Sequence, residues 1–217
     1  MVGHPTAGLG MKSYLERDTG PGAFEQIRGL GWTPTARLDE AAQERVMARL
    51  AGKYMGANPR KGATYKWIPN HLADALRLVS PRSFLVALRT AAAWMQSRPT
   101  VSRDRILTPA SLEEGVRAAS LQRVEELAED FPWVQEVRRR LEGLLVPAAE
   151  SEVIARLKRS ELSPPQKGLR STEPRSMLDQ LVALGVFLRD PDGRCNVPDL
   201  YRVAMDMKRR GGIRLAR

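Results

Sequence analysis

Basic side chains recur through the last third of the sequence at positions where they could neutralise the phosphates of a nucleic acid. Lysine and arginine supply the sequence-independent part of such binding, because each contacted phosphate releases a condensed counterion. The helix expected over residues 173–184 also carries Glu173, Asp179 and Gln180 and a single arginine, which is a thinner positive face than DNA-reading helices usually show. Weak, non-specific binding of duplex DNA is therefore predicted. The candidate phosphate-binding residues are Lys167, Arg170, Arg175, Arg189, Arg194, Lys208, Arg209 and Arg210.

Residues that could carry out catalysis are scarce and scattered. A phosphate-binding loop needs glycines followed by Lys and then Ser or Thr, and neither Gly52-Lys53-Tyr54 nor Lys61-Gly62 fits that pattern. A zinc site needs several His or Cys ligands at close spacing, whereas His4, His71 and Cys195 are far apart. His71 could serve as a general base, but an isolated histidine among apolar residues is more typical of a structural role. The sequence predicts no catalytic residue, no metal site and no enzymatic activity.

The net charge of the chain is +10, and the excess of positive charge is uneven. Residues 1–110 hold sixteen Lys and Arg against eight Asp and Glu, residues 111–150 hold five against nine, and residues 151–217 hold fourteen against eight. The carboxylates of the acidic segment 111–150 are spaced from its arginines as residues on the surface of one helix are, which is typical of solvated ion pairs. A basic protein attracts polyanions, and nucleic acid is the commonest of them. Acidic protein surfaces, anionic membranes and a merely arginine-rich composition are the alternatives.

Three features of the sequence indicate the cellular compartment in which the protein works. The single cysteine, Cys195, excludes an internal disulfide. No stretch approaches the roughly 20 apolar residues that a membrane-spanning helix needs. The first ten residues lack the early positive charges and the apolar core of a signal peptide. We expect a cytoplasmic protein without a membrane partner.

Helical periodicity dominates the chain after a lead-in rich in Gly and Pro. Apolar residues recur at helical spacing over residues 38–55. Pro69 and Pro81 are each expected to open a helix, the second with Ser80 as its N-cap. The expected buried stripe of that second helix is formed by Phe84, Leu88, Ala91 and Met95.

An acidic helical stretch follows. Ser111 and Glu114 have the spacing of a capping box, so a helix is expected to begin there. Phe131-Pro132-Trp133 should interrupt it, and a further helix should end near Pro147.

The last third changes from helical to alternating periodicity and back. Its order of helix, helix, β-hairpin and helix is typical of a winged-helix domain, in which the hairpin is the wing. The expected elements are helices over 150–159 and 173–184, a loop at 163–168, strands at 186–189 and 194–197 around a turn at 190–193, and a helix from Pro198 through Met207 that ends at 208–212.

The sequence thus predicts a mainly α chain, in which a helical lid-like domain is followed by a winged-helix domain. The predicted divisions are an irregular lead-in (1–35), the lid-like domain (36–110), an acidic helical connector (111–149) and the winged-helix domain (150–217).

From about residue 36 to residue 217 the chain resembles the C-terminal part of bacterial P-loop ATPases of the AAA+ and STAND type. The segments that carry the resemblance are Tyr65–Asp74, Ser80–Arg89, Asp192–Arg202 and Arg209–Gly212. The resemblance implies a lid and a winged helix, and it places the nucleotide-binding core of such proteins upstream of this region. Two explanations remain open: a truncated ATPase, or a stand-alone relative that lost its core.

The resemblance also implies a role for two arginines. In AAA+ relatives an arginine at the start of a lid helix touches the nucleotide phosphates, and Arg82 holds that place here, with Arg89 on nearly the same helix face. No cofactor is expected on the isolated chain, and ATP is expected only with a separate ATPase core. Three functions remain. The first is a non-catalytic nucleic-acid-binding or regulatory module, and the alternative to it is a protein-interaction module that packs on an ATPase core or a partner subunit. The third is nucleotide-dependent catalysis in a complex, in which Arg82 acts on a phosphate bound by another chain.

Overall fold

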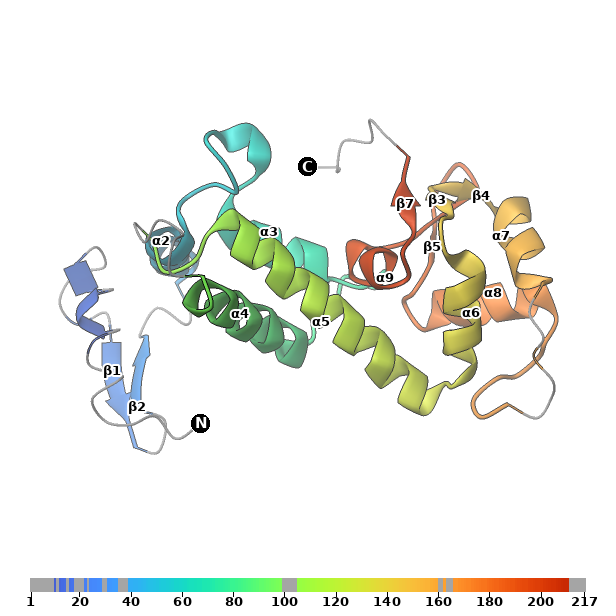
Figure 1. Cartoon of the computed structure of the whole chain (residues 1–217), viewed down its shortest axis with the longest axis horizontal. Coiled ribbons are helices and arrows are strands. Elements are labelled where there is room, and N and C mark those ends of the chain that lie inside the picture. The colour runs from blue at the N-terminus through green and yellow to red at the C-terminus, as the bar shows by residue number, and fades with distance from the viewer. Residues whose placement is uncertain are drawn as a thin grey trace. The chain divides into compact units, whose positions relative to one another are not determined.

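The computed structural model of the chain is mainly helical, with short strands between the helices (Figure 1). The prediction of a mainly helical chain is therefore confirmed. Most of the predicted lead-in lies outside the described residues, as do positions 163–165 of the predicted loop. The structure describes residues 39–98, 105–159, 162 and 166–210 and, before residue 39, residues 10, 12–14, 16–17, 22, 24–28 and 31–34.

The chain forms two compact units. One unit contains residues 1–68 and 91–112, and the other contains residues 69–90 and 113–217. In the first unit, the helix expected over 38–55 is present as α2 (Glu40–Ala51), but it ends four residues earlier, where Gly52 adopts a positive φ of 85°. The side chain of Asp39 caps it by accepting hydrogen bonds from two backbone N–H groups of its first turn. The other short elements of this unit are the antiparallel strands β1 (Phe24–Ile27) and β2 (Gly31–Pro34) and the 3-10 turn η2 (Pro59–Lys61).

Two helices begin earlier than the sequence indicates. Helix α3 (Thr64–Leu72) contains Pro69 instead of beginning there, because buried residues on both sides of the proline continue one helical face. Helix α5 (Pro109–Asp130) is capped by Thr108 rather than by Ser111. The Thr108 N–H donates to Ser111 Oγ (2.9 Å), and the Ser111 N–H donates to Thr108 Oγ1 (3.3 Å). Ser111 therefore takes the third-residue position of the capping box.

Helix α4 (Pro81–Gln96) begins at Pro81 as expected, but its buried stripe is shifted by one residue in its first half. Ser83 and Ala87 are buried, whereas Phe84 and Leu88 are only half-buried. The reason is a close helix–helix approach at Gly115 of α5, where an added Cβ would lie 2.2 Å from the backbone oxygen of Ala87. Only small residues fit at such a crossing, so the larger side chains lie to either side of it.

The rest of the second unit alternates short helices with short strands (Figure 1). The break predicted at Pro132 is confirmed, and so are the helices predicted over 150–159 and 173–184 and the β-hairpin after them. The helix directly after the break ends at Leu141 and not near Pro147, because Gly143 adopts a positive φ of 73° and residues 145–146 form a strand. The elements are α6 (Trp133–Leu141), β3 (Leu145–Val146), β4 (Ala148–Ala149), α7 (Glu150–Leu157), α8 (Pro174–Ala183), β5 (Leu188–Arg189), β6 (Arg194–Asn196), α9 (Asp199–Ala204) and β7 (Lys208–Arg209).

Two small sheets tie these elements together. Strand β6 lies in the centre of an antiparallel sheet of order β4-β6-β5, in which Ala148 and Arg189 both pair with Cys195. Strand β7 pairs in parallel with β3. The prediction that the last helix continues through Met207 is wrong, because Asp206 adopts a positive φ of 53° and residues 208–209 join the β3 strand.

Large apolar side chains from α6, α7, α8 and α9 and from the segment after α8 contribute much of the core of the second unit. The fully buried members include Trp133, Leu141, Leu157, Met177, Leu178, Leu181, Phe187 and Tyr201. Among the residues described, no helix combines the length and the apolar character that crossing a membrane requires.

Candidate functional site

Helix α8 is the element that the sequence assigns to a nucleic-acid groove, and its outward face is set by its cap and its core. The Glu173 side chain accepts hydrogen bonds from the backbone N–H groups of Arg175 (3.1 Å) and Ser176 (2.7 Å). Met177, Leu178 and Leu181 are buried. Arg175 and Asp179, four residues apart, therefore share the exposed face.

The β5–β6 hairpin presents the second group of candidate residues. Its turn is closed by hydrogen bonds between Asp190 and Arg194 (Asp190 N–H to Arg194 C=O, 2.7 Å) and between Gly193 N–H and Asp190 C=O (2.9 Å). Gly193 has a φ of +79°, which favours glycine at this position. Because Cys195 points inward, its neighbour Arg194 is exposed, as is Arg189 on the facing strand.

Each exposed arginine of this region is paired with a carboxylate. Arg189 Nη2 lies 2.5 Å from Asp179 Oδ1, and Arg189 Nε lies 2.9 Å from Glu150 Oε2. The hydrogen bonds that the Arg189 guanidinium donates to Asp179 and Glu150 raise the pKa of Arg189. Arg175 approaches Glu150 within 3.3 Å, and Arg194 approaches Asp192 within 2.6 Å. These contacts bring together three of the predicted phosphate-binding residues, but in ion pairs.

We call this region the helix–hairpin surface, and its charges do not favour a polyanion. It holds three arginines and five carboxylates, so phosphates would meet a surface with a net negative charge. Exposed ion pairs of this kind contribute about 0 to 1 kcal/mol each, so they set the charge balance more than they set stability. The charged members are Glu150, Glu173, Arg175, Asp179, Arg189, Asp190, Asp192 and Arg194.

Two other predicted phosphate-binding residues take no part in these ion pairs. Lys167 Nζ donates to the backbone oxygen of Glu129 (2.8 Å). Arg170 is exposed and borders the helix–hairpin surface, because its backbone N–H donates to Gln180 Oε1 (3.2 Å) and it lines a cavity with Asp179. The structure therefore spreads the eight candidate residues over several places.

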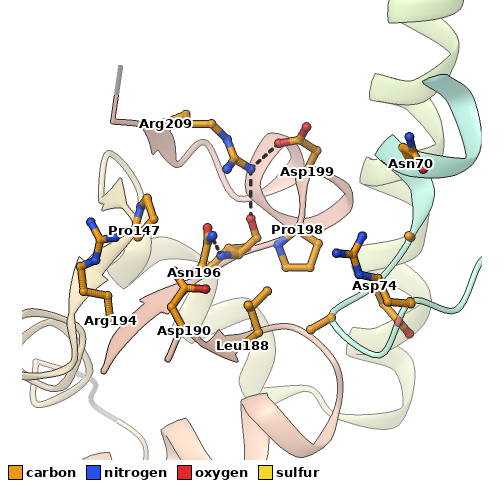
Figure 2. A pocket seen from close by; sticks show the side chains of 14 residues that line it. Asn70, Asp74, Pro147, Leu188, Asp190, Arg194, Asn196, Pro198, Asp199 and Arg209 are labelled. Carbon is orange, nitrogen blue, oxygen red and sulfur yellow. Dashed lines mark hydrogen bonds and ion pairs between the residues drawn. The ribbon is translucent and has the colours of Figure 1, made fainter. Parts of the chain in front are cut away.

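Strand β7 separates the last three candidate residues, because side chains alternate along a strand. Lys208 and Arg210 are exposed, and neither has a side-chain partner within the described ranges. Arg209 turns inward, where its Nη2 donates to Asp199 Oδ1 (2.8 Å) and approaches the oxygen of Val197 at 3.5 Å (Figure 2). Only two of the three side chains are therefore available to a ligand.

Asp199 at the start of α9 is the charged centre that sequence reasoning missed. Its Oδ1 accepts from Arg202 Nε (2.7 Å) as well as from Arg209, and its Oδ2 lies 3.4 Å from His71 Nε2. Burial alone would raise the pKa of Asp199, but the hydrogen bonds and charges of Arg202 and Arg209 outweigh it and lower that pKa. A carboxylate held ionised in this way is a poor proton acceptor, so this cluster fits a structural role. The only sequence signal for this charged cluster was His71, a histidine with no other His or Cys close to it in the sequence.

A cavity of about 380 Å³ lies beside this cluster (Figure 2). Three arginines and three aspartates line it, so its charges balance and favour neither an anion nor a cation. The charged lining residues are Asp74, Arg77, Asp190, Arg194, Asp199 and Arg209.

Helix α4 carries the two arginines that the resemblance links to a nucleotide. Arg82 Nη1 lies 3.2 Å from Glu126 Oε1 of α5. Burial alone would raise the pKa of Glu126, but hydrogen bonds from Gln122 and Arg82 lower it. Arg89 is exposed and has no side-chain partner in the part of the chain that the structure describes. Nucleotide sensing by these arginines stays a prediction.

Comparison with known proteins gives no relative from which a site could be transferred: no family model, no curated protein and no solved structure matches the chain. Within the described ranges, no group of three or more His, Cys, Asp and Glu residues could hold a metal ion. The function must therefore be argued from the charges and the exposed side chains themselves.

Proposed function

We propose that residues 133–210 form a winged-helix module. The order α6-β4-α7-α8-β5-β6 supports this proposal, because such modules place two successive helices before a β-hairpin. The antiparallel order β4-β6-β5 gives the hairpin a third strand that anchors it to the helices. In this arrangement α8 is the recognition helix, the β5–β6 hairpin is the wing, and the module begins at α6 rather than at residue 150.

We further propose that this module is a non-catalytic, protein-binding regulatory module. The observation that carries this proposal is the charge of the helix–hairpin surface, where three arginines stand against five carboxylates. DNA-binding surfaces carry an excess of Lys and Arg, because phosphate contacts supply most of their affinity. A mixed surface with paired charges resembles the polar rim of a protein–protein interface instead. The resemblance suggests a cytoplasmic P-loop ATPase core as the partner, and ATP would be bound by that core.

Nucleic-acid binding is the second candidate function. It is favoured by the net charge of +10 and by the exposed Lys208 and Arg210, whose side chains have no partner among the described residues. Binding through these residues would be weak, non-specific and strongly dependent on salt.

Photo-cross-linking in the cells that make the protein distinguishes the two functions. A benzophenone amino acid is placed at Asp192 in the hairpin turn, where it projects from the proposed wing, and in separate cells at Lys208. We expect the cross-linked species at Asp192 to be destroyed by protease and unchanged by nuclease. Species at both positions that nuclease shortens would contradict protein binding and favour the second candidate.

A further inference from the structure

The turn that connects α3 to α4 is built to a fixed shape. Asp74 Oδ1 accepts hydrogen bonds from the backbone N–H groups of Leu76 (2.8 Å) and Leu78 (2.9 Å), and the Asp74 N–H donates to the Leu78 oxygen (3.0 Å). The Ala75 N–H donates to the oxygen of Gly185, just after α8 (2.9 Å). Arg77 adopts a positive φ of 63°, which is uncommon for a non-glycine residue. The hydrogen bonds of Asp74 and Ala75 thus hold the turn at both ends and in its middle.

This rigid turn exposes apolar side chains that the core does not use. Leu76 is 57% exposed and Leu78 is 63% exposed. On the first turns of α4, Leu85 is 65% exposed. Arg82, Leu85 and Arg89 follow at i, i+3 and i+7, so they share one helix face. We call Leu76, Arg77, Leu78, Arg82, Leu85 and Arg89 the leucine–arginine face.

The charge of this face is positive. Its six residues include three arginines and no Asp or Glu. Arg82 is paired with Glu126. Arg77 lines the cavity that Asp74, Asp190 and Asp199 also line, but it makes no ion pair with a described residue, and Arg89 has no partner among the residues that the structure describes. A partner that brings carboxylates therefore gains two charge pairs without displacing an existing one.

We propose that the leucine–arginine face is the docking site for an acidic amphipathic helix of a partner protein. This inference rests on the proposed protein-binding function and names the chemistry of its partner. Apolar residues of the partner helix would cover Leu76, Leu78 and Leu85, and carboxylates beside them would pair with Arg77 and Arg89. Helices commonly bind in this way, through apolar anchors at i, i+3 or i+4 and i+7 with charges at the border.

The same observations disfavour two other occupants. A second copy of the chain would bring one positive face against another, and like charges repel. A lipid surface is fluid, so it gains nothing from leucines fixed by the Asp74 hydrogen bonds, whereas a shaped protein surface gains affinity from such preorganisation. Leu85 is also the one large apolar side chain that α4 exposes over residues 81–96, which is little area for insertion into a bilayer.

The test uses the full chain and a displayed library of helical peptides with randomised surface positions. Peptides are selected on the natural chain and counter-selected on the double variant Leu78→Ser/Leu85→Ser. We expect the enriched peptides to carry Asp or Glu beside apolar residues at i, i+3 or i+4 and i+7. Binding of a selected peptide, measured by fluorescence anisotropy, should weaken at least tenfold in this variant. It should weaken similarly in Arg77→Glu/Arg89→Glu, which provides a second test if the leucine variant does not fold.

The matched control is Lys158→Glu/Arg159→Glu, which makes the same change of charge at two exposed residues directly after α7 and should change peptide affinity less than twofold. Three results would overturn the inference: no enrichment over the counter-selected chain, enriched peptides without acidic residues, or equal binding by both variants. Sedimentation with phosphatidylglycerol vesicles that is lost in the leucine variant would also overturn it, in favour of a membrane. The cross-linking experiment tests the proposed function separately. If the cross-links at Asp192 resist nuclease and are destroyed by protease, protein binding remains supported even when one of these results overturns the inference.

Discussion

Two regions of the second unit use arginine in opposite ways. On the helix–hairpin surface and around Asp199, arginines are paired with carboxylates at distances of 2.5 to 3.3 Å. On the leucine–arginine face, Arg77 and Arg89 have no carboxylate partner among the described residues. A binding surface therefore cannot be located by counting basic residues, because a neighbouring carboxylate cancels the field that would attract an anion.

How firmly a carboxylate holds its arginine partner also depends on how deeply the carboxylate is buried. Asp199 has an exposed side-chain fraction of 12%, whereas Asp179 is 58% exposed, although each accepts from an arginine. A nearly buried carboxylate cannot replace its partners with water, so its arginines are bound to the fold. An exposed carboxylate can make that exchange at little cost.

The largest expected effect concerns this difference. Asp199→Asn should lower the free energy of unfolding by about 2 to 3 kcal/mol, because Arg202 and Arg209 would keep their buried charge without its counter-charge. Asp179→Asn is the matched control and should change it by less than about 0.5 kcal/mol. Urea denaturation at neutral pH measures both, and equal effects would remove the distinction between buried and exposed pairs.

The pH dependence of stability follows from the same residue. Because the folded-state pKa of Asp199 is lowered, its contribution is present above the unfolded value of about 4 and is lost as the pH falls through the lower folded value. The variant Asp199→Asn should therefore lose less stability than the natural chain below about pH 4.

A smaller effect is expected when the helix–hairpin surface is made positive. The triple variant Glu150→Gln/Asp179→Asn/Asp192→Asn leaves three arginines and two carboxylates. Affinity for generic duplex DNA at low salt should rise by about threefold to tenfold, and the dependence of log affinity on log salt should steepen by about 0.9 for each new phosphate contact. Anisotropy over a salt series measures it. The control is Glu113→Gln/Glu125→Gln/Glu129→Gln on α5, which removes the same number of carboxylates. A gain of the same size in this control would mean that only the net charge matters.

The smallest expected effect concerns the exposed leucines. Leu76→Ser and Leu85→Ser should each change the free energy of unfolding by less than about 0.5 kcal/mol, because neither side chain contributes to the core. Thermal and urea unfolding of each variant check this expectation. A loss above about 1.5 kcal/mol would mean that the leucines stabilise the fold and are not reserved for a partner.

The elements that the sequence predicted well are those with local signals. Glu173 and Gly185 bound α8 closely, and Asp190–Gly193 form the expected turn. The strands β3, β4 and β7 have two residues each and exist only through pairing with distant segments, so no periodicity indicates them.

For the candidate site, too, the sequence predicted the features that have a local signal and missed those that depend on distant residues. The sequence identified Arg189 as an exposed cation, but its partner Glu150 is 39 residues away and could not be assigned from spacing. The single leucines at 76, 78 and 85 gave no sequence signal either, because an isolated exposed leucine is common. What distinguishes two of them is the hydrogen-bonded turn that holds them, which only the structure supplies.

The close contact between Gly115 and Ala87 lies on the side of α4 opposite to Leu85. Each helical residue turns the direction of its side chain by about 100°, so Leu85 points roughly 200° away from Ala87. Because a Cβ at position 115 would lie 2.2 Å from the Ala87 oxygen, only glycine at that position lets α5 approach α4 this closely on the Ala87 side. A hydrogen atom in place of a side chain on α5 thereby contributes to keeping Leu85 and Arg89 on the outward side of α4.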